Sequence, residues 1–193
     1  MRLFVALDIP GGIRQLISAY VDELRRVAPD AKWVRHESYH VTLKFIGEWK
    51  KDVQAVIEAL QKIEAPPVTI AIRRNGFFPT SRSPRVFWVG IEGDNNLLPL
   101  ANKVNEGCFS LGIEREARDF SPHLTLARSG SGSPRPKRDE PLASSMKRLA
   151  ERIATMPRPD FGTIHAMEFF LYESKLSPGG AQYTKLKAFP LRG

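Results

Sequence analysis

At 193 residues, with 42% hydrophobic and 26% charged side chains, the chain has the composition of a globular protein that can bury a core without crosslinks. The single cysteine, Cys108, excludes an internal disulfide, and no run approaches the roughly 18 apolar residues needed to span a bilayer. Asp8 and Pro10 interrupt the apolar N-terminus too soon for a signal peptide, so we expect a cytoplasmic protein without a membrane segment, and its net charge of +8 favours an anionic partner.

The order of strand and helix patterns predicts an α+β fold. The first half predicts a strand at 3–7, an amphipathic helix over 13–27, a strand near 38–46, a helix over 53–63, a strand at 68–72 and a turn-rich loop at 76–84. The second half predicts a strand at 86–91, a helix over 97–111, a strand near 121–128, a surface loop at 129–141, a helix over 142–156 and closing strands at 164–171 and 182–191. Because there is no strict βαβ alternation, we expect antiparallel sheets with helices on their outer faces.

The pattern His-x-Thr-Leu occurs twice, once on each of two predicted strands. His40 and Thr42 belong to the first copy, and His123 and Thr125 belong to the second. Side chains alternate between the two faces of a strand, so each histidine shares a face with its threonine while the apolar residues between them point into a core. Each copy therefore presents one imidazole beside one hydroxyl.

Several landmarks repeat at one offset. The two histidines are 83 residues apart, and the same offset relates Thr42 to Thr125, the segment Arg-Leu-Phe at 2–4 to Arg-Val-Phe at 85–87, and Gly47 to Gly130. Two repeats are too few for a solenoid. The spacing instead predicts a single domain over 1–193 with two pseudo-symmetric lobes, with one motif strand in each.

Two histidines suit metal-free acid–base chemistry at a phosphodiester. An imidazole titrates near neutrality, so one histidine can take a proton from water while the other gives a proton to a leaving oxygen. Threonine hydroxyls can hold the non-bridging oxygens. A zinc site would want further ligands at recognisable spacing, and His36 and His165 are accompanied by no carboxylate pair or cysteine cluster. We therefore expect no metal and no cofactor; the competing interpretation is that both histidines are ordinary sheet residues.

The chain resembles the two-histidine (2H) phosphoesterase superfamily, most closely its bacterial and archaeal RNA 2′,3′-cyclic phosphodiesterases, also called 2′-5′ RNA ligases. The resemblance covers nearly the whole chain and rests on the segments RLFVALDIP, KWVRHESYHVTLKFIGE, FFPTSRSPRVFWVGI, FSPHLTLAR and YTKLKAFPL. It implies a bilobal antiparallel α+β domain with the two motifs facing across a cleft, which agrees with the duplication inferred from the spacing.

The resemblance also implies an activity and residue roles. RNA ends or nucleotides carrying a 2′,3′-cyclic phosphate would be hydrolysed to 2′-phosphomonoesters, with His40 as proton donor and His123 as proton acceptor. Thr42 and Thr125 would bind the phosphate. In reverse, the same site would join a cyclic end to a 5′-hydroxyl, but hydrolysis is favoured because water is abundant. A module that binds cyclic nucleotides or RNA ends without turnover stays open as an alternative, and no obligatory protein partner is predicted.

Other residues near the two motifs are candidates for contacts with the substrate. Arg128 comes after the second motif and could neutralise phosphate charge. The alternation of side chains along a strand places it on the face opposite that of Thr125, unless the strand ends before Arg128. Lys44 is an even number of residues from His40 on the same predicted strand, so its side chain should lie on the face of His40. We expect it either to point into the cleft or to be solvated at the end of the strand. Phe77, Phe78 and Trp33 are candidates for stacking on a base, with core packing as the competing role.

Overall fold

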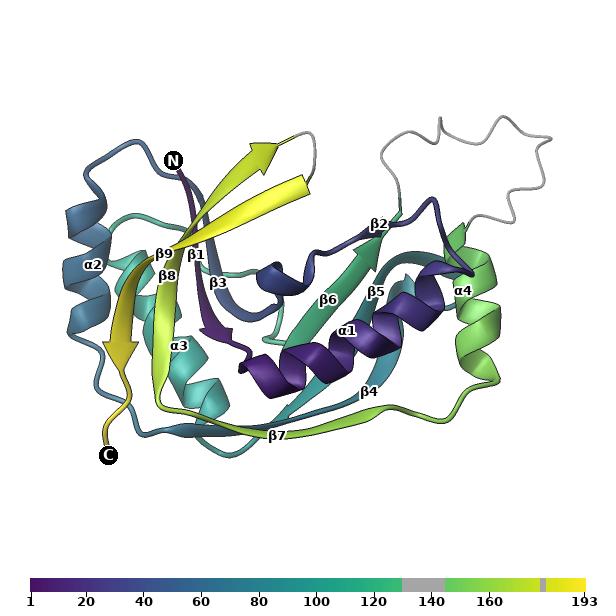
Figure 1. Ribbon diagram of the computed structural model, residues 1–193. Coiled ribbons are helices and arrows are strands. Elements are labelled where there is room, and N and C mark those ends of the chain that lie inside the picture. The colour runs from purple at the N-terminus through teal and green to yellow at the C-terminus, as the bar shows by residue number, and fades with distance from the viewer. Residues whose placement is uncertain (130–144, 178–179) are drawn as a thin grey trace.

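The computed structural model describes residues 1–129, 145–177 and 180–193. It contains two antiparallel sheets, shown in Figure 1. The four-stranded sheet has the order β3-β1-β8-β9, formed by β3 (His40–Glu48), β1 (Arg2–Asp8), β8 (Glu168–Ser177) and β9 (Gly180–Pro190). The five-stranded sheet has the order β2-β6-β5-β4-β7, formed by β2 (Lys32–Trp33), β6 (His123–Arg128), β5 (Ser83–Gly93), β4 (Val68–Thr80) and β7 (Asp160–Ala166). The predicted α+β class is confirmed.

The helices lie on the outer faces of the sheets, as expected. They are α1 (Gly11–Arg25), α2 (Val53–Gln61), α3 (Leu97–Phe109) and α4 (Ser145–Ala154), and a 3-10 turn, η1, covers His36–Ser38. Helix α3 packs against β3 of the four-stranded sheet and against α2, whereas α1 packs against β7 and α4 against β5 of the five-stranded sheet. The helix that comes after β1 along the chain therefore covers the other sheet, and so does the helix that comes after β5.

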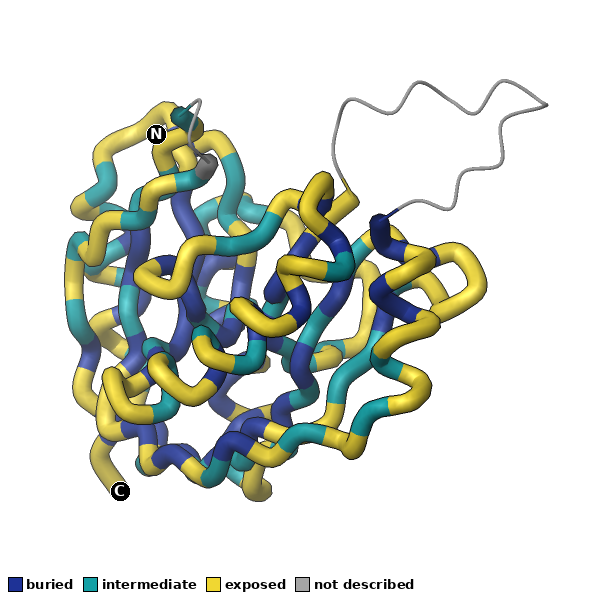
Figure 2. Tube along the Cα trace, turned by 45° about the vertical axis from the view of Figure 1, so that its right-hand side comes forward, coloured by how far each residue is buried: buried dark blue, intermediate teal, exposed yellow. Residues whose placement is uncertain are grey.

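The core lies between these helices and the sheets. The apolar side of α1, with Ile17, Val21 and Leu24, is fully buried, as the 3.6-residue spacing of these side chains predicts. In Figure 2 the buried stretches run along the strands through the middle of the molecule. Within the described residues, no helix combines the length and the apolar character needed to cross a membrane.

The predictions for two segments, 76–84 and 164–171, were wrong. Residues 76–84 are not a loop: β4 continues to Thr80 and pairs with β5, so the turn of this hairpin occupies only the residues between Thr80 and Ser83. The pairing is irregular between Ile72 and Asn75, where Arg74 has φ 64°, and this break in alternation hides the strand from a periodicity argument.

The strand predicted at 164–171 is two strands in different sheets. β7 ends at Ala166 in the five-stranded sheet and β8 begins at Glu168 in the four-stranded sheet, with the exposed Met167 between them. An apolar run gives no sign of such a crossing, because both strands bury side chains. The loop predicted at 129–141 lies outside the described residues except for Ser129, and the helix predicted over 142–156 is described from Ser145.

Candidate active site

His40 is the first residue of β3, and Tyr39 alone separates it from the 3-10 turn. Its ring packs 4.7 Å from the ring of Phe4 and 5.1 Å, edge to face, from the ring of Tyr183. Its Nδ1 lies 2.7 Å from the carbonyl oxygen of Ser38. A carbonyl oxygen can only accept, so Nδ1 carries the proton, and in the neutral ring Nε2 is left with a free lone pair.

His123 repeats this arrangement on the other sheet. It stands at the start of β6, and its Nδ1 lies 2.8 Å from the carbonyl oxygen of Ser121, again two residues earlier in the chain. Its ring meets Phe78 edge to face at 5.0 Å. Strands β3 and β6 contact each other, and His123 is close enough for a positive charge on its ring to lower the pKa of His40. The structure thus brings together the two histidines that the motif singled out.

Each motif strand contains a bulge at the same place. In the pairing of β1 with β3, Ala6 lies opposite Thr42 and Val5 opposite Lys44, so Leu43 is the extra residue. In the pairing of β5 with β6, Leu126 is skipped in the same way. Both strands show the same burial sequence: a half-buried histidine and threonine separated by one buried residue, then two buried residues, then an exposed one. A bulge inverts the alternation of faces after it.

The bulge changes the predicted positions of two residues. Arg128 is still within the strand, yet it returns to the face of Thr125. Its charge contributes to the low pKa of His40 and offsets part of the rise that burial causes in the pKa of Tyr183. Lys44 moves to the opposite face, so both expectations for it were wrong. Its side chain is 2% exposed, and Nζ donates to the carbonyl oxygen of Glu114 at 2.6 Å and lies 3.5 Å from a carboxylate oxygen of Glu116.

The candidate stacking residues separate into different environments. Phe77 is buried in the core beside Phe87, and Trp33 packs against the same core with its Nε1 donating to the carbonyl oxygen of Ala28. Phe78 points the other way, toward His123 and Trp88, whose ring lies 5.1 Å from that of Phe78. Of the three, Phe78 is the one that borders the motif face.

Burial sets the charge state of His40 in the free protein. The pKa of His40 is lowered to about 4, chiefly by removal from water; the charges of His123 and Arg128 contribute to the lowering, whereas the Ser38 carbonyl and Asp8 act in the opposite direction. His40 is therefore neutral at neutral pH. Burial also raises the pKa of the Tyr172 and Tyr183 phenols, so both stay protonated beside it.

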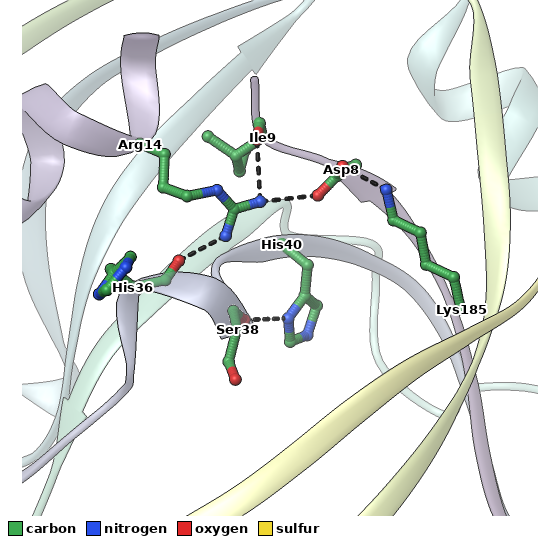
Figure 3. Close-up of polar contacts among 7 residues, drawn as sticks. All are labelled: Asp8, Ile9, Arg14, His36, Ser38, His40 and Lys185. Carbon is green, nitrogen blue, oxygen red and sulfur yellow. Dashed lines mark hydrogen bonds and ion pairs between the residues drawn. The ribbon is translucent and has the colours of Figure 1, made fainter. Parts of the chain in front are cut away.

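A cavity of about 440 Å³ opens beside His40. Four charged residues that the sequence argument missed line it: Asp8 at the end of β1, Arg14 on α1, Glu37 in the 3-10 turn and Lys185 on β9. A carboxylate oxygen of Asp8 lies 2.8 Å from Nη2 of Arg14, and the other lies 2.5 Å from Nζ of Lys185 (Figure 3). The pairing of Asp8 with His40 across β1 and β3 was the signal that sequence reasoning lacked.

The other ionisable candidates lie outside the motif faces. The His36 side chain is exposed and contacts Glu37. His165 is on the edge strand β7, where its Nδ1 lies 3.0 Å from the Thr69 hydroxyl of β4. Cys108 is buried, which raises its pKa to about 11, as suits a core thiol. Across the described parts of the chain, no three His, Cys, Asp or Glu side chains gather as a metal site.

Comparison with known proteins identifies the family. The chain matches the profile of LigT-like phosphoesterases twice, over residues 7–88 and 89–183. It is 35% identical to an RNA 2′,3′-cyclic phosphodiesterase of Archaeoglobus fulgidus, over 98% of this chain and 99% of the relative, and 32% identical to one of Methanocaldococcus jannaschii, over 97% and 99%. The crystal structure of Escherichia coli LigT in complex with 3′-AMP superposes with a TM-score of 0.76 at 29% identity, covering 98% of this chain and 97% of that one. Two matched histidine strands on two sheets, together with these likenesses along the full length, place the chain in the LigT-like phosphoesterase family.

Proposed function

We propose that this protein hydrolyses the 2′,3′-cyclic phosphodiester at RNA ends or on nucleotides to a 2′-phosphomonoester. The observation that carries the proposal is the matched pair His40 and His123, each with Nδ1 on a carbonyl and a threonine two residues further on. The relatives named RNA 2′,3′-cyclic phosphodiesterase support the substrate class. The net charge of +8 suits a polyanionic substrate such as RNA. An RNA substrate and a single cysteine both suit a cytoplasmic enzyme.

The reaction needs a proton acceptor, a proton donor and an anchor for the phosphate. Nε2 of His123 takes a proton from water as the water attacks phosphorus, and the bond to the 3′ oxygen breaks on the opposite side. Nε2 of His40 gives a proton to that departing oxygen. Thr42 and Thr125 donate hydroxyl hydrogens to the non-bridging oxygens, and the positive charge of Arg128 faces the phosphate from β6.

Substrate binding supplies what the donor lacks in the free protein. His40 is neutral there, so it must acquire a proton before it can act as donor. A phosphodiester anion placed between the histidines favours the protonated imidazole and raises its pKa. We therefore assign protonation of His40 to the complex with substrate. With a 5′-hydroxyl in place of water as the nucleophile, the same step would form a 2′-5′ linkage at this site, and the 3′ oxygen would again leave.

Product analysis tests the proposal. With 2′,3′-cyclic AMP as substrate, the product should be adenosine 2′-phosphate, measured by phosphorus NMR. A 3′-phosphate would mean that the substrate sits reversed between the two motifs, with the histidine roles exchanged. Binding of the cyclic nucleotide without any turnover would instead support a binding module.

Removal of metal should leave the activity nearly unchanged. The proposed acid, base and phosphate anchors are all side chains of this chain, so no step depends on a metal-bound water. The rate should be measured after dialysis against EDTA and again after addition of zinc or manganese. A loss of turnover that either metal restores would contradict the mechanism.

The pH profile should reflect the low pKa of His40. In the free protein His40 is neutral above a pH of about 4 and protonated below it, so kcat/KM, which reports the ionisation of the free protein, should have its acid limb near that pH. Bound phosphate raises the pKa of His40, so the acid limb of kcat should lie at higher pH than the acid limb of kcat/KM. Steady-state rates from about pH 3 to about pH 9 measure both limbs. If both acid limbs coincided near the ordinary histidine pKa of about 6.5, burial would not be lowering the pKa of His40.

A further inference from the structure

Arg14 makes three polar contacts that join three segments around His40. Its Nη2 donates to a carboxylate oxygen of Asp8 at 2.8 Å and to the carbonyl oxygen of Ile9 at 2.9 Å, and its Nη1 donates to the carbonyl oxygen of His36 (Figure 3). The side chain is 17% exposed, so these contacts fix the guanidinium in one place. A planar guanidinium can hold several acceptors at fixed directions, which an ammonium cannot do.

The contact with His36 acts on the peptide segment that orients His40. His36 begins the 3-10 turn that ends at Ser38, and the Ser38 carbonyl oxygen is the partner of His40 Nδ1. Because Arg14 hydrogen-bonds both to the His36 carbonyl and to Asp8, it holds the 3-10 turn against the end of β1. A hydrogen bond at one nitrogen of an imidazole determines which tautomer the ring adopts and where the other nitrogen points.

The contact with Asp8 places a negative charge next to the ring. Asp8 is paired with His40 across the two strands, and Lys185 holds its second carboxylate oxygen at 2.5 Å. Lys185 is itself positioned over the ring of Phe170, at 4.1 Å from its centre. Asp8 is thus kept beside the imidazole by partners from α1 and β9, and its charge favours the protonated ring.

Among the residues that the structure describes, the second motif lacks the charged strand partner of the first. His40 lies opposite Asp8, whereas His123 lies opposite Gly90, which has no side chain. His123 shares the carbonyl contact of His40 but has no charged residue at the paired position. The support is therefore specific to the histidine that we assign as proton donor.

We infer that Arg14 and Asp8 are positioning residues for His40: Arg14 holds the 3-10 turn so that neutral His40 keeps its proton on Nδ1, and Asp8 supports the imidazolium that forms when substrate binds. The kinetic consequence rests on the proposed function, whereas the tautomer of His40 does not. Neither residue is required to touch the reacting atoms.

The test compares Arg14→Gln and Asp8→Asn with the wild-type protein. Nitrogen-15 NMR of the imidazoles should show neutral wild-type His40 as the Nδ1–H tautomer, and Arg14→Gln should give a mixture of tautomers at His40 alone. Asp8→Asn should make His40 titrate at lower pH. In both variants kcat should fall roughly 10- to 100-fold with KM nearly unchanged, as for loss of a partner that orients a functional histidine.

Two controls separate this role from a general effect. His123 provides an internal reference, since its tautomer should stay the same in both variants. Arg25→Gln removes an exposed arginine of the same helix that pairs with Asp22, and it should change neither the His40 spectrum nor kcat. The other titratable or charged groups around His40 stay in place throughout; they are Glu37, Tyr172, Tyr183, Lys185, His123 and Arg128.

Each outcome decides the inference. Unchanged tautomer in Arg14→Gln together with an unchanged titration in Asp8→Asn would overturn it. If Arg14→Gln does not fold, Arg14→Lys keeps the charge but cannot hold all three acceptors, and the same spectrum should then show mixed tautomers. If the wild-type protein turns over no cyclic phosphate, the proposed function fails while the NMR comparison still tests the positioning of His40.

Discussion

Replacement of His40 or His123 by alanine should each lower turnover of 2′,3′-cyclic AMP by about 10²–10⁴-fold, the usual contribution of one general acid or base. The double variant should lose much less than the product of the two single effects, because both groups act in one chemical step. Single-turnover rates measure these losses without interference from product release.

The two remaining histidines serve as matched controls. His36→Ala keeps the backbone carbonyl that Arg14 contacts and removes only an exposed ring, and His165→Ala removes a ring at the sheet edge near Thr69. Both variants should retain near-normal turnover. A loss in His36→Ala as large as that in His40→Ala would show that the motif assigns the wrong histidine.

Removal of either threonine hydroxyl should give the second large effect. Thr42→Val and Thr125→Val keep the β-branched shape that suits a strand but cannot donate to the phosphate, so kcat should fall about 10²–10³-fold, as for loss of one donor to a developing charge. Thr42→Ser and Thr125→Ser retain the hydroxyl and should recover most of the rate.

A distant threonine tests whether the loss is local. The Thr155 hydroxyl contacts a backbone carbonyl at the end of α4, so Thr155→Val should leave kcat and KM unchanged. Equal activity in the valine and serine variants of Thr42 would mean that its hydroxyl does not hold the phosphate.

The sequence was sufficient to predict the faces of the two motif strands as far as the threonines, but no further. Alternation correctly placed Thr42 with His40 and Thr125 with His123, because the strands are regular over these residues. The bulges at Leu43 and Leu126 depend on how β1 and β5 pair with the motif strands, and the residues themselves do not reveal them. For that reason strict alternation put both Lys44 and Arg128 on the wrong face of their strands.

The charged support of His40 was beyond reach for another reason. Asp8 and Lys185 are separated by 177 residues, and Arg14 lies on a helix whose polar face carries other charges as well. Nothing in the local pattern distinguishes these three residues from solvated surface charges. They become recognisable only when the order of strands in the four-stranded sheet brings both ends of the chain beside His40.

Neither sheet belongs to one half of the chain. The four-stranded sheet joins β3 and β1 to β8 and β9 from the C-terminal part, and the five-stranded sheet includes β2 and β4 from the N-terminal part. A chain of half this length on the same plan would leave strand edges unpaired and one sheet face without its helix. It would complete both only with a second copy, related by a two-fold axis through the site. The arrangement is that expected when a symmetric homodimer is fused into one polypeptide, which then allows its two histidines to acquire different surroundings.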